Sequence, residues 1–195
     1  NPCHIMPMPL LRPATTDDAA TIVALMDMAS HGMACALWAA LTPAGEDPDT
    51  FAIARAQRDK GGFSYRNTRI LMQDDQPAGM LMAWPLPPAP LPTEDLPALA
   101  IPLQQLENLA PRAALYINAL AVFPAFRRRG LARYMLDNAG QNTAGQGPQA
   151  LITGSDNHAA LGLYHSAGFT EIARRPAAGD AIWQPPFPDW LLLTR

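Results

Sequence analysis

Apolar and polar residues follow one another along this chain with two different periods, and each change of period marks the boundary of a predicted element. Apolar side chains three and four residues apart are typical of an amphipathic helix, whereas short apolar or alternating runs between turn residues are typical of strands. Helices are expected on this basis at residues 17–30, 31–41, 48–60, 103–109, 131–141 and 157–167. Strands are expected at residues 10–14, 69–73, 78–84, 115–122, 150–153, 169–174 and 190–194. Strands and helices thus alternate, which indicates an α/β protein.

Turn and cap residues support several of these boundaries. Thr15 or Thr16 can cap the first helix through its hydroxyl oxygen, and the Asp-Asp-Gln sequence at 74–76 suits the turn of a β-hairpin. Residues 115–153 form a strand-helix-strand pattern, so the two strands of this unit should be parallel. The last two predicted strands are expected to pair antiparallel.

The bulk composition indicates one globular domain over residues 1–195. Hydrophobic residues make up 49% and charged residues 16% of the chain, which argues against disorder. The net charge of −3 provides no general attraction to nucleic acid or anionic lipid. No apolar run is long enough to span a bilayer. A cytoplasmic protein with neither nucleic acid nor membrane as a partner is therefore expected.

The two cysteines, Cys3 and Cys35, cannot build a disulfide framework, and no Cys/His cluster indicates a metal site. Cys35 lies in an apolar helical pattern and is expected to be a small core residue. Residues 1–9 lack the charged-then-apolar layout of a secretory signal. They are expected to be disordered or vector-derived, with Met6 or Met8 as a native start.

Residues 85–111 interrupt the regular pattern with a Pro-rich insertion. The chain has 21 prolines, roughly twice the average share, and many of them lie here. The insertion is either a rigid surface loop or a functional segment, namely a lid over a substrate site or a dimer contact.

Residues 122–132 read V-F-P-A-F-R-R-R-G-L-A, a strand end followed by a proline turn, a basic glycine loop and a helix start. Backbone N–H groups of such a turn can cradle a pyrophosphate, and the arginines add positive charge. Gly130 lets the backbone approach an anion without a side chain in the way. The segment therefore indicates a phosphate-bearing ligand, with a solvated basic turn as the alternative.

A second motif starts at Asn157. Ala160, Leu163 and Tyr164 follow at helical spacing, and Gly168, before Phe169, suits the left-handed position after a helix end. With the first motif, this segment resembles the GNAT superfamily of N-acetyltransferases. Its pyrophosphate loop, Arg/Gln-x-x-Gly-x-Gly/Ala, is matched by Arg127, Gly130 and Ala132. Its later motif, Asn-x-x-Ala-x-x-x-Tyr followed by Gly-Phe, is matched by Asn157, Ala160, Tyr164, Gly168 and Phe169.

The resemblance implies an α/β (α+β) fold, a GNAT-like mixed and mostly antiparallel twisted sheet of about six to seven strands. Helices would cover both faces, and one parallel strand pair would be splayed. It also implies acetyl-CoA as cofactor and the primary amine of a small molecule, protein or peptide as acceptor. Family members often dimerise, so a homodimer is expected.

The resemblance also assigns roles to individual residues. The pantetheine arm would pair with the strand at Leu120, Ala121 and Val122, with an amide near Leu120 as oxyanion donor. The cofactor diphosphate would contact Arg127, Arg128, Arg129, Gly130, Leu131, Ala132 and Arg133. Asn157 would hydrogen-bond the pantetheine arm, although a helix N-cap is the alternative. Tyr164 would be the general acid and a cofactor contact, with core packing as the alternative.

A general base is not identified by the sequence. Many family members carry a carboxylate on the strand that matches residues 115–122, where this chain has Tyr116 and Asn118 as polar-capable residues. Glu107 and His31 are further candidates, and loss of the amine proton to water is another route. A non-catalytic acyl-CoA-binding regulatory module on the same fold therefore remains the alternative function.

The acceptor pocket is expected between the helices of residues 17–60 and the strands after Phe169. Apolar side chains could form its wall, although such residues at helical spacing are usually core. The candidates are Met26, Met28, Met33, Trp38 and Phe63.

Overall fold

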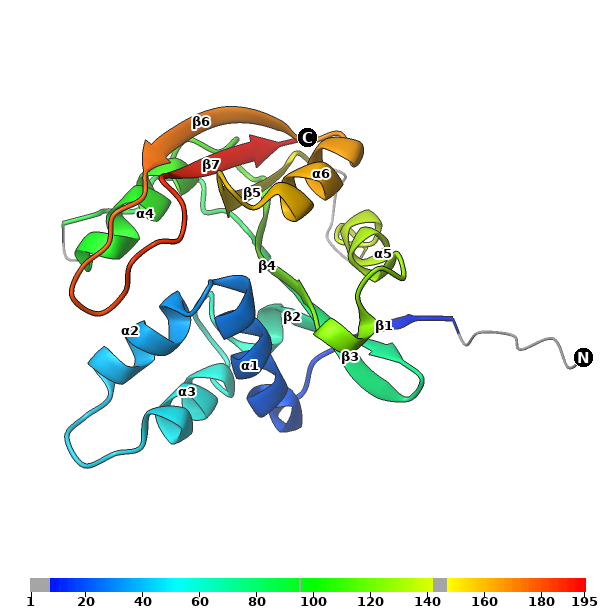
Figure 1. Ribbon diagram of the computed structural model, residues 1–195, viewed down its shortest axis with the longest axis horizontal. Coiled ribbons are helices and arrows are strands. Elements are labelled where there is room, and N and C mark those ends of the chain that lie inside the picture. The colour runs from blue at the N-terminus through cyan, green and yellow to red at the C-terminus, as the bar shows by residue number, and fades with distance from the viewer. Residues whose placement is uncertain (1–7, 95, 142–146) are drawn as a thin grey trace, which may run out of the picture.

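The computed structural model describes residues 8–94, 96–141 and 147–195, so Cys3 and most of the expected N-terminal extension lie outside it. The described residues form a seven-stranded sheet in the order β1-β2-β3-β4-β5-β7-β6 (Figure 1). The strands are β1 Leu10–Pro13, β2 Thr68–Gln73, β3 Gln76–Pro85, β4 Leu115–Val122, β5 Gln149–Gly154, β6 Thr170–Pro176 and β7 Asp189–Thr194. The helices are α1 Ala19–Ala29, α2 Met33–Leu41, α3 Pro48–Ala56, α4 Ile101–Glu107, α5 Leu131–Asp137 and α6 His158–Ser166. Short 3-10 turns lie at Thr16–Asp18, Tyr65–Asn67, Ala98–Ala100 and Pro124–Phe126.

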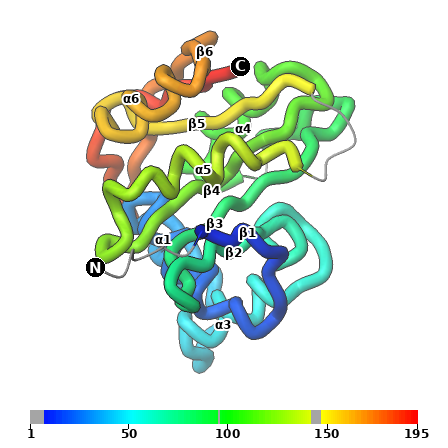
Figure 2. The backbone as a smooth tube through the Cα atoms, turned by 90° about the vertical axis from the view of Figure 1, so that its right-hand side faces the viewer, coloured from blue at the N-terminus to red at the C-terminus, as the bar shows by residue number. Residues whose placement is uncertain are grey.

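The predicted fold class is confirmed. Neighbouring strands pair antiparallel except β4 and β5, which are parallel. Helices α5 and α6 pack on one face of the sheet, and α1 to α3 pack on the other over β2, β3 and β4. Figure 2 shows β1, β2, β3 and α3 in the lower part of the molecule and β5, α4 and α6 in the upper part, with β4 between them.

Two predicted helices are longer than the observed ones. Helix α3 ends at Ala56 and not at residue 60: the Arg58 N–H donates to the Arg55 carbonyl oxygen, three residues back, and the Arg58 carbonyl accepts from the Ser64 hydroxyl. Helix α5 ends at Asp137 and not at residue 141. There the Tyr134 carbonyl oxygen accepts both the Asn138 N–H at 3.2 Å and the Asn138 side-chain amide at 2.7 Å. Side-chain donors thus satisfy backbone carbonyl groups at or just after both helix ends.

The prediction for Cys35 was wrong, because this side chain is exposed. Helix α2 buries the side that carries Ala34 and Trp38, and Cys35 points away from it. A nine-residue helix that is apolar on most positions does not reveal from sequence which side faces the core.

The Pro-rich insertion contributes to the core. Helix α4 begins at Ile101, with Pro102 in its first turn, and lies two residues earlier than predicted. It packs against β5, β6 and β7, and Leu99 and Leu106 are fully buried. The Asn108 side chain fastens the arm by a pair of hydrogen bonds to the Leu91 backbone, at 2.9 and 2.8 Å. This segment therefore covers the sheet face beside α1 to α3.

One irregularity in β4 changes the direction of its side chains in the middle of the strand. Met82 pairs with Ala119, but the next residue of β3, Ala83, pairs with Ile117. Asn118 is thus the extra residue of a β-bulge, which reverses the direction of the side chains that follow. Ile117 packs with α5 and α6, whereas Ala119 packs with α1.

The bulge coincides with the end of the parallel pairing. β4 pairs with β5 only from Leu115 to Ile117, opposite Gln149 to Leu151. Beyond this point β5 pairs only with β7 among the described strands, and the second half of β4 pairs only with β3. The two central strands therefore splay apart, as the fold class implied.

Candidate active site

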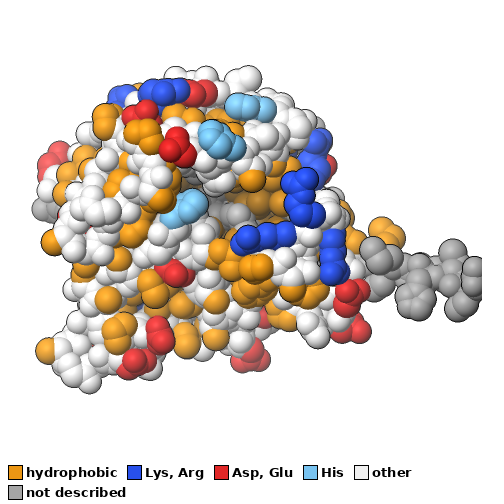
Figure 3. Space-filling view, viewed as in Figure 1, with side chains coloured by type: hydrophobic (Ala, Val, Ile, Leu, Met, Phe, Trp, Pro, Cys, Tyr) orange, Lys and Arg blue, Asp and Glu red, His pale blue; other side chains and the backbone are white. Residues whose placement is uncertain are grey.

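A cavity of about 740 Å³ occupies the gap between the splayed strands. Its walls come from the end of α1, the second half of β4, the start of α5, the end of β5 and helix α6. Figure 3 shows a hollow on this face, with arginine and lysine side chains grouped on one side and hydrophobic ones on the other. The two predicted motifs, far apart in sequence, meet across this cavity.

The β4 edge of the cavity presents backbone groups that pair with no other strand among the described residues. The Phe123 N–H donates to the Ala78 carbonyl oxygen at 2.8 Å, so this residue points toward β3. Because successive residues of a strand point their N–H groups to opposite sides, those of Leu120 and Val122 point into the gap. The Val122 carbonyl also lies there, where it accepts from Arg127 Nε at 3.0 Å.

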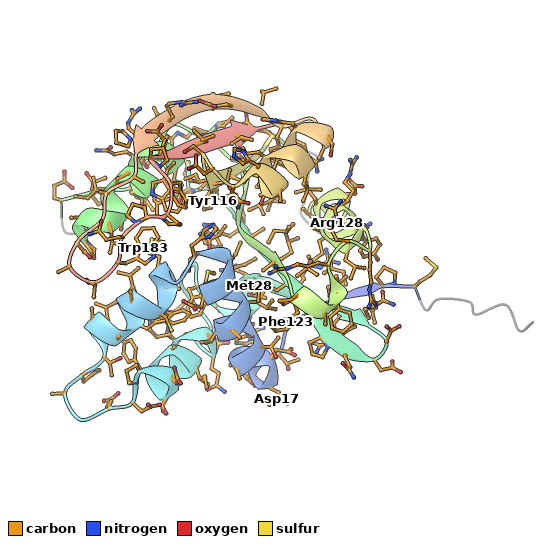
Figure 4. All side chains as sticks on the ribbon, in the orientation of Figure 1. Asp17, Met28, Tyr116, Phe123, Arg128 and Trp183 are labelled. Atoms are coloured by element: carbon orange, nitrogen blue, oxygen red, sulfur yellow. The ribbon has the colours of Figure 1, made fainter. Side chains whose placement is uncertain are left out.

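The basic loop turns through two left-handed residues, Arg128 with φ of 63° and Gly130 with φ of 76°. Arg128 lines the cavity, is exposed, and makes no ion pair or hydrogen bond among the described residues. Figure 4 places Arg128 across the gap from Met28 of α1. Its guanidinium is therefore available to an anion.

The other arginines of the loop are held by neighbours. Arg127 contacts Met28 Sδ through Nη2 at 3.1 Å, in addition to its bond to β4. Arg133 lines the cavity and forms an ion pair with Asp137 at 2.9 Å. Arg129 does not line the cavity, because its side chain lies over the Phe126 ring and 3.6 Å from an Asp74 carboxylate oxygen.

Tyr164 lines the cavity from α6, with 8% of its surface exposed. Its ring packs on Phe169 at a centroid distance of 6.0 Å, and its hydroxyl has no hydrogen-bond partner within the described residues. Burial raises the pKa of Tyr164 to about 12. The hydroxyl therefore stays protonated at neutral pH and is a hydrogen-bond donor.

Asn157 has the helix N-cap role that was the alternative in the sequence analysis. Its side-chain oxygen accepts from the Ala160 N–H at 3.4 Å, which makes it the N-cap of α6. The same residue lines the cavity. All other predicted cofactor contacts except Arg129 also line it, namely Leu120, Ala121, Val122, Gly130, Leu131 and Ala132.

The structure separates the four candidates for a general base. His31 and Asn118 line the cavity, whereas Tyr116 and Glu107 do not. Tyr116 is buried on the α4 side of the sheet with its ring 5.5 Å from Trp84. Burial raises the pKa of the Tyr116 hydroxyl and that of the Glu107 carboxyl.

Of the apolar residues predicted to form an acceptor wall, Met28 alone lines the cavity in the described structure. Met26 and Trp38 are buried between α1 to α3 and the sheet, and Phe63 packs on Trp38 at 5.1 Å. Met33 packs against the aromatic residues beside α4. Residues of helices α1 to α3 thus serve chiefly as core, which was the alternative interpretation.

The sequence analysis missed an aromatic cluster at one end of the cavity. Trp190 of β7 lines the cavity, and its ring packs on Phe187 at 4.5 Å and on Trp183 at 6.3 Å. Both partners lie in the loop 177–188, whose ends are joined by the hydrogen bond from the Ala177 N–H to the Pro188 carbonyl. The segment Ile182–Trp190, rich in proline and aromatics, was the available signal.

This loop reaches across to the end of α1. Trp183 Nε1 donates to the His31 carbonyl oxygen at 2.9 Å, and the His31 ring meets Phe187 edge to face at 5.5 Å. His31 has a φ of 55°, a left-handed conformation that is uncommon for a residue with a side chain. Gly154 makes room for the loop, since a Cβ atom there would lie 2.4 Å from the Phe187 ring.

Within the described parts of the chain, no cluster of His, Cys, Asp or Glu side chains suited to a metal ion occurs. No described helix alone has the length and apolar composition to cross a membrane. The bent pair Thr16–Ala29 and Met33–Leu41 meets those two criteria only when taken together.

The comparison with protein families matches residues 32–169 to the acetyltransferase (GNAT) family. Solved structures share the fold at low identity. An N-acetyltransferase from Staphylococcus aureus Mu50 is 16% identical with a TM-score of 0.61, over 95% of this chain and 100% of the other. The ribosomal-protein-S18-alanine N-acetyltransferase from Escherichia coli is 17% identical with a TM-score of 0.57, over 96% and 92%. A chain of the NatC complex bound to Gag peptide and CoA is 18% identical with a TM-score of 0.56, over 96% and 98%. The comparison with curated proteins gave no significant match.

Proposed function

The chain belongs to the acetyltransferase (GNAT) family, and on this premise we propose that it is an acetyl-CoA-dependent N-acetyltransferase. The acceptor would be the primary amine of a small molecule, protein or peptide. One observation carries the proposal: the sheet opens between β4 and β5, and both sequence motifs line the opening.

The residues present fit coenzyme A. The N–H groups of Leu120 and Val122 point into the gap, where an extended arm with amide groups can pair with β4 as an added strand. At the end of the same cavity Arg128 has no partner among the described residues, and a guanidinium binds phosphate oxygens by charge-assisted hydrogen bonds. When bound, acetyl-CoA supplies an acetyl group activated as a thioester.

Leu120 and Tyr164 provide the polar groups that acetyl transfer to an amine needs. The Leu120 N–H is a fixed donor in the gap and can stabilise negative charge on a carbonyl oxygen. The Tyr164 hydroxyl can donate to a departing sulfur. Since its pKa of about 12 exceeds that of an alkyl thiol, about 8.5, it stabilises a thiolate by a hydrogen bond without giving up its proton completely.

The relatives support an amine acceptor. One similar structure is named as an alanine N-acetyltransferase of a ribosomal protein, and another is described as bound to a peptide and CoA. An acceptor amine would enter the same cavity from the side of His31 and Trp190, away from Arg128 and Arg133.

The second candidate function is a non-catalytic module that binds acyl-CoA. The observation in its favour is that no Asp or Glu among the described residues lines the cavity, so no carboxylate is at hand as a general base. Transfer without such a base requires that the amine loses its proton to water or to His31.

Calorimetric titration and thiol release together test the proposal. We expect binding heat in titrations with CoA and with acetyl-CoA. We also expect thiol release from acetyl-CoA in the presence of a primary amine. Heat without thiol release on a broad amine panel would identify the binding module. No heat with either CoA species, on protein shown to be folded by circular dichroism, would contradict both functions.

A further inference from the structure

The cavity has two ends of different chemistry. The loop end is basic and carries Arg128 and Arg133. The other end is walled by Met28, Ile117, Ile152 and Trp190. Its polar side chains are His31 and Asn118, and Arg127 of the basic loop contacts Met28. Figure 4 shows Trp183, which packs behind Trp190, on the side of the gap opposite to Arg128.

The aromatic end is held in place by contacts of its own. Trp183 is fixed to the His31 backbone, and Phe187 packs between the His31 ring and Trp190. Trp183, Phe187 and Trp190 are each at most 8% exposed. Trp190, which lines the cavity, is therefore backed by two fixed rings, and an apolar or aromatic group can be buried against it.

The charges around the cavity disfavour a second ammonium group. Its ionisable lining residues in the described structure are one imidazole, three guanidinium groups and one phenol, namely His31, Arg127, Arg128, Arg133 and Tyr164. A buried ammonium without an anionic partner is costly, and no carboxylate among the described residues lines the cavity to supply one. A polyamine would thus carry an unpaired charge into this end.

The same surroundings favour the reactive form of a single amine. Apolar walls and the absence of a carboxylate both keep the pKa of an amine low, because they do not stabilise its charged form. A free amine has the lone pair that attacks a carbonyl carbon. The absence of carboxylates therefore raises the fraction of a monoamine that is uncharged and reactive. The same absence means that no carboxylate can act as the general base.

We propose that the end of the cavity beside Met28, Asn118 and Trp190 is the acceptor subsite, and that it selects a monoamine carried on an apolar or aromatic group. This inference rests on the proposed acetyltransferase function. The amine-bearing group comes either from a small molecule or from the N-terminus of a peptide with an apolar first residue.

Hexylamine and 1,6-diaminohexane form a matched pair of probes, since they differ by one terminal ammonium group. The protein is loaded with CoA for binding measurements by saturation-transfer NMR, and with acetyl-CoA for kinetics. Hexylamine is expected to bind at least tenfold more tightly and to have a kcat/KM at least tenfold higher. Preference for the diamine would overturn the proposal.

The two sources are separated by a second pair of probes. Amides of Phe-Ala-Ala and Lys-Ala-Ala present the same backbone with an apolar or a charged first side chain. If the Phe peptide is a better acceptor than 2-phenylethylamine, a peptide N-terminus is the source; the reverse order indicates a small amine. In either case the Lys peptide is expected to be the weaker peptide, and the opposite order would contradict the proposal.

Asn118→Asp places a carboxylate at the centre of this subsite with little change in shape. It is expected to reduce the preference for hexylamine over the diamine at least fivefold. Gln105→Glu is the control, because Gln105 is exposed on α4, does not line the cavity, and the change adds the same charge. An equal shift in both variants would show that the preference for hexylamine does not depend on charge inside the subsite, and would contradict the proposal.

Measuring amine binding and amine acetylation separately distinguishes failure of the proposed function from failure of the proposed selectivity. If CoA and hexylamine both bind but no amine is acetylated, the proposed function fails while the selectivity stands. If amines are acetylated with the diamine preferred, the function stands and the selectivity fails.

Discussion

The two ends of the cavity are built in different ways. The basic end comes from one continuous segment, in which β4 runs into the loop at Arg128 and Gly130 and then into α5. The aromatic end is assembled from α1, β4, β5, β7 and the loop 177–188, which are up to 152 residues apart at the bond between Trp183 and His31. The basic end is thus formed by local backbone geometry, whereas the aromatic end is formed by tertiary packing.

This difference bears on what each end can recognise. Backbone N–H groups and arginines at a fixed spacing suit a constant ligand such as a diphosphate. Side chains contributed by five separate segments can change one at a time without disturbing the strand pairing. The basic end therefore suits a shared cofactor, and the aromatic end suits an acceptor particular to this chain.

The largest effect is expected at Tyr164, which lines the cavity from α6 and belongs to neither set of end residues. Tyr164→Phe removes the hydroxyl and should lower kcat about 100-fold or more, the range typical of a positioned proton donor. The affinity for CoA, measured by calorimetry, should change less than about threefold because the ring and its packing on Phe169 remain.

The pH dependence of the same enzyme follows from the Tyr164 pKa. Since burial raises it to about 12, the hydroxyl stays protonated through neutral and mildly basic pH, and kcat should show no fall assignable to Tyr164 below about pH 11.

Tyr134→Phe is the matched control for Tyr164→Phe, because Tyr134 lies on α5 outside this cavity. A loss in the control equal to that of Tyr164→Phe would remove Tyr164 from the reaction.

The second prediction concerns the basic end alone. Arg128→Gln should weaken CoA binding roughly 10- to 100-fold, because a charge-assisted hydrogen bond to phosphate contributes about 1.5–3 kcal/mol. Arg129→Gln should weaken it less than about threefold, since Arg129 lies over Phe126 and near Asp74. Calorimetry at two salt concentrations compares the variants. Equal losses would mean that the loop acts only through its overall charge.

The third prediction concerns the aromatic end alone. Gly154→Ala puts a Cβ atom 2.4 Å from the Phe187 ring, which must move together with the loop 177–188. Overpacking of this kind costs about 1–3 kcal/mol, so kcat/KM for the acceptor should fall about tenfold while CoA affinity is retained.

Gly162→Ala is the control for this change. Gly162 lies in α6 with no heavy atom within 4 Å of the added Cβ, so the substitution should stabilise the protein by about 0.5–1 kcal/mol. Urea denaturation measures both variants. A Gly154→Ala variant with normal acceptor kinetics would show that the aromatic loop does not shape the acceptor subsite.

The smallest effect is expected at the far end of α1, the helix that brings Met28 and His31 to the cavity. Arg12 donates to both Asp18 carboxylate oxygens at 2.8 Å and lowers the Asp18 pKa. A lowered folded pKa stabilises the protein above the ordinary carboxyl pKa of about 4, and this stabilisation is lost as pH falls through that value toward the folded pKa.

Asp18→Asn should therefore lower the unfolding free energy at pH 7 by about 1–2 kcal/mol and flatten its decline between pH 5 and pH 3. Asp17→Asn is the control, since the neighbouring Asp17 is exposed and has no ion pair among the described residues. Urea titrations across this pH range make the comparison. Identical pH profiles for Asp18→Asn and the wild-type protein would exclude the ion pair as a stabilising contact.

Much of the fold could be read from the chain because strand and helix periods depend on neighbours in sequence. The bounds of β4 were predicted correctly, as was its parallel pairing with β5. The bulge at Asn118 was not predicted. It depends on how Ala83 and Met82 of β3 sit opposite, and a strand's own pattern does not report the register of its partner.

The candidate site likewise contains residues that the sequence identified and residues that only the structure revealed. Arg127, Gly130 and Tyr164 were identified by spacing, and all three line the cavity. Spacing did not reveal that Arg129 turns toward Asp74, because consecutive residues of an irregular loop have no fixed periodicity. Nor did it connect Trp190 with His31, which are joined through Phe187 and Trp183 in the folded chain.

By itself, the sequence determined the elements, the family motifs and the anion-binding loop, because each rests on contacts within a few residues. The tertiary structure alone decided the width of the gap in the sheet, the direction of each arginine and the aromatic wall of the acceptor end. Those features arise from side chains distant along the chain that are packed at close range, and no local pattern encodes such neighbours.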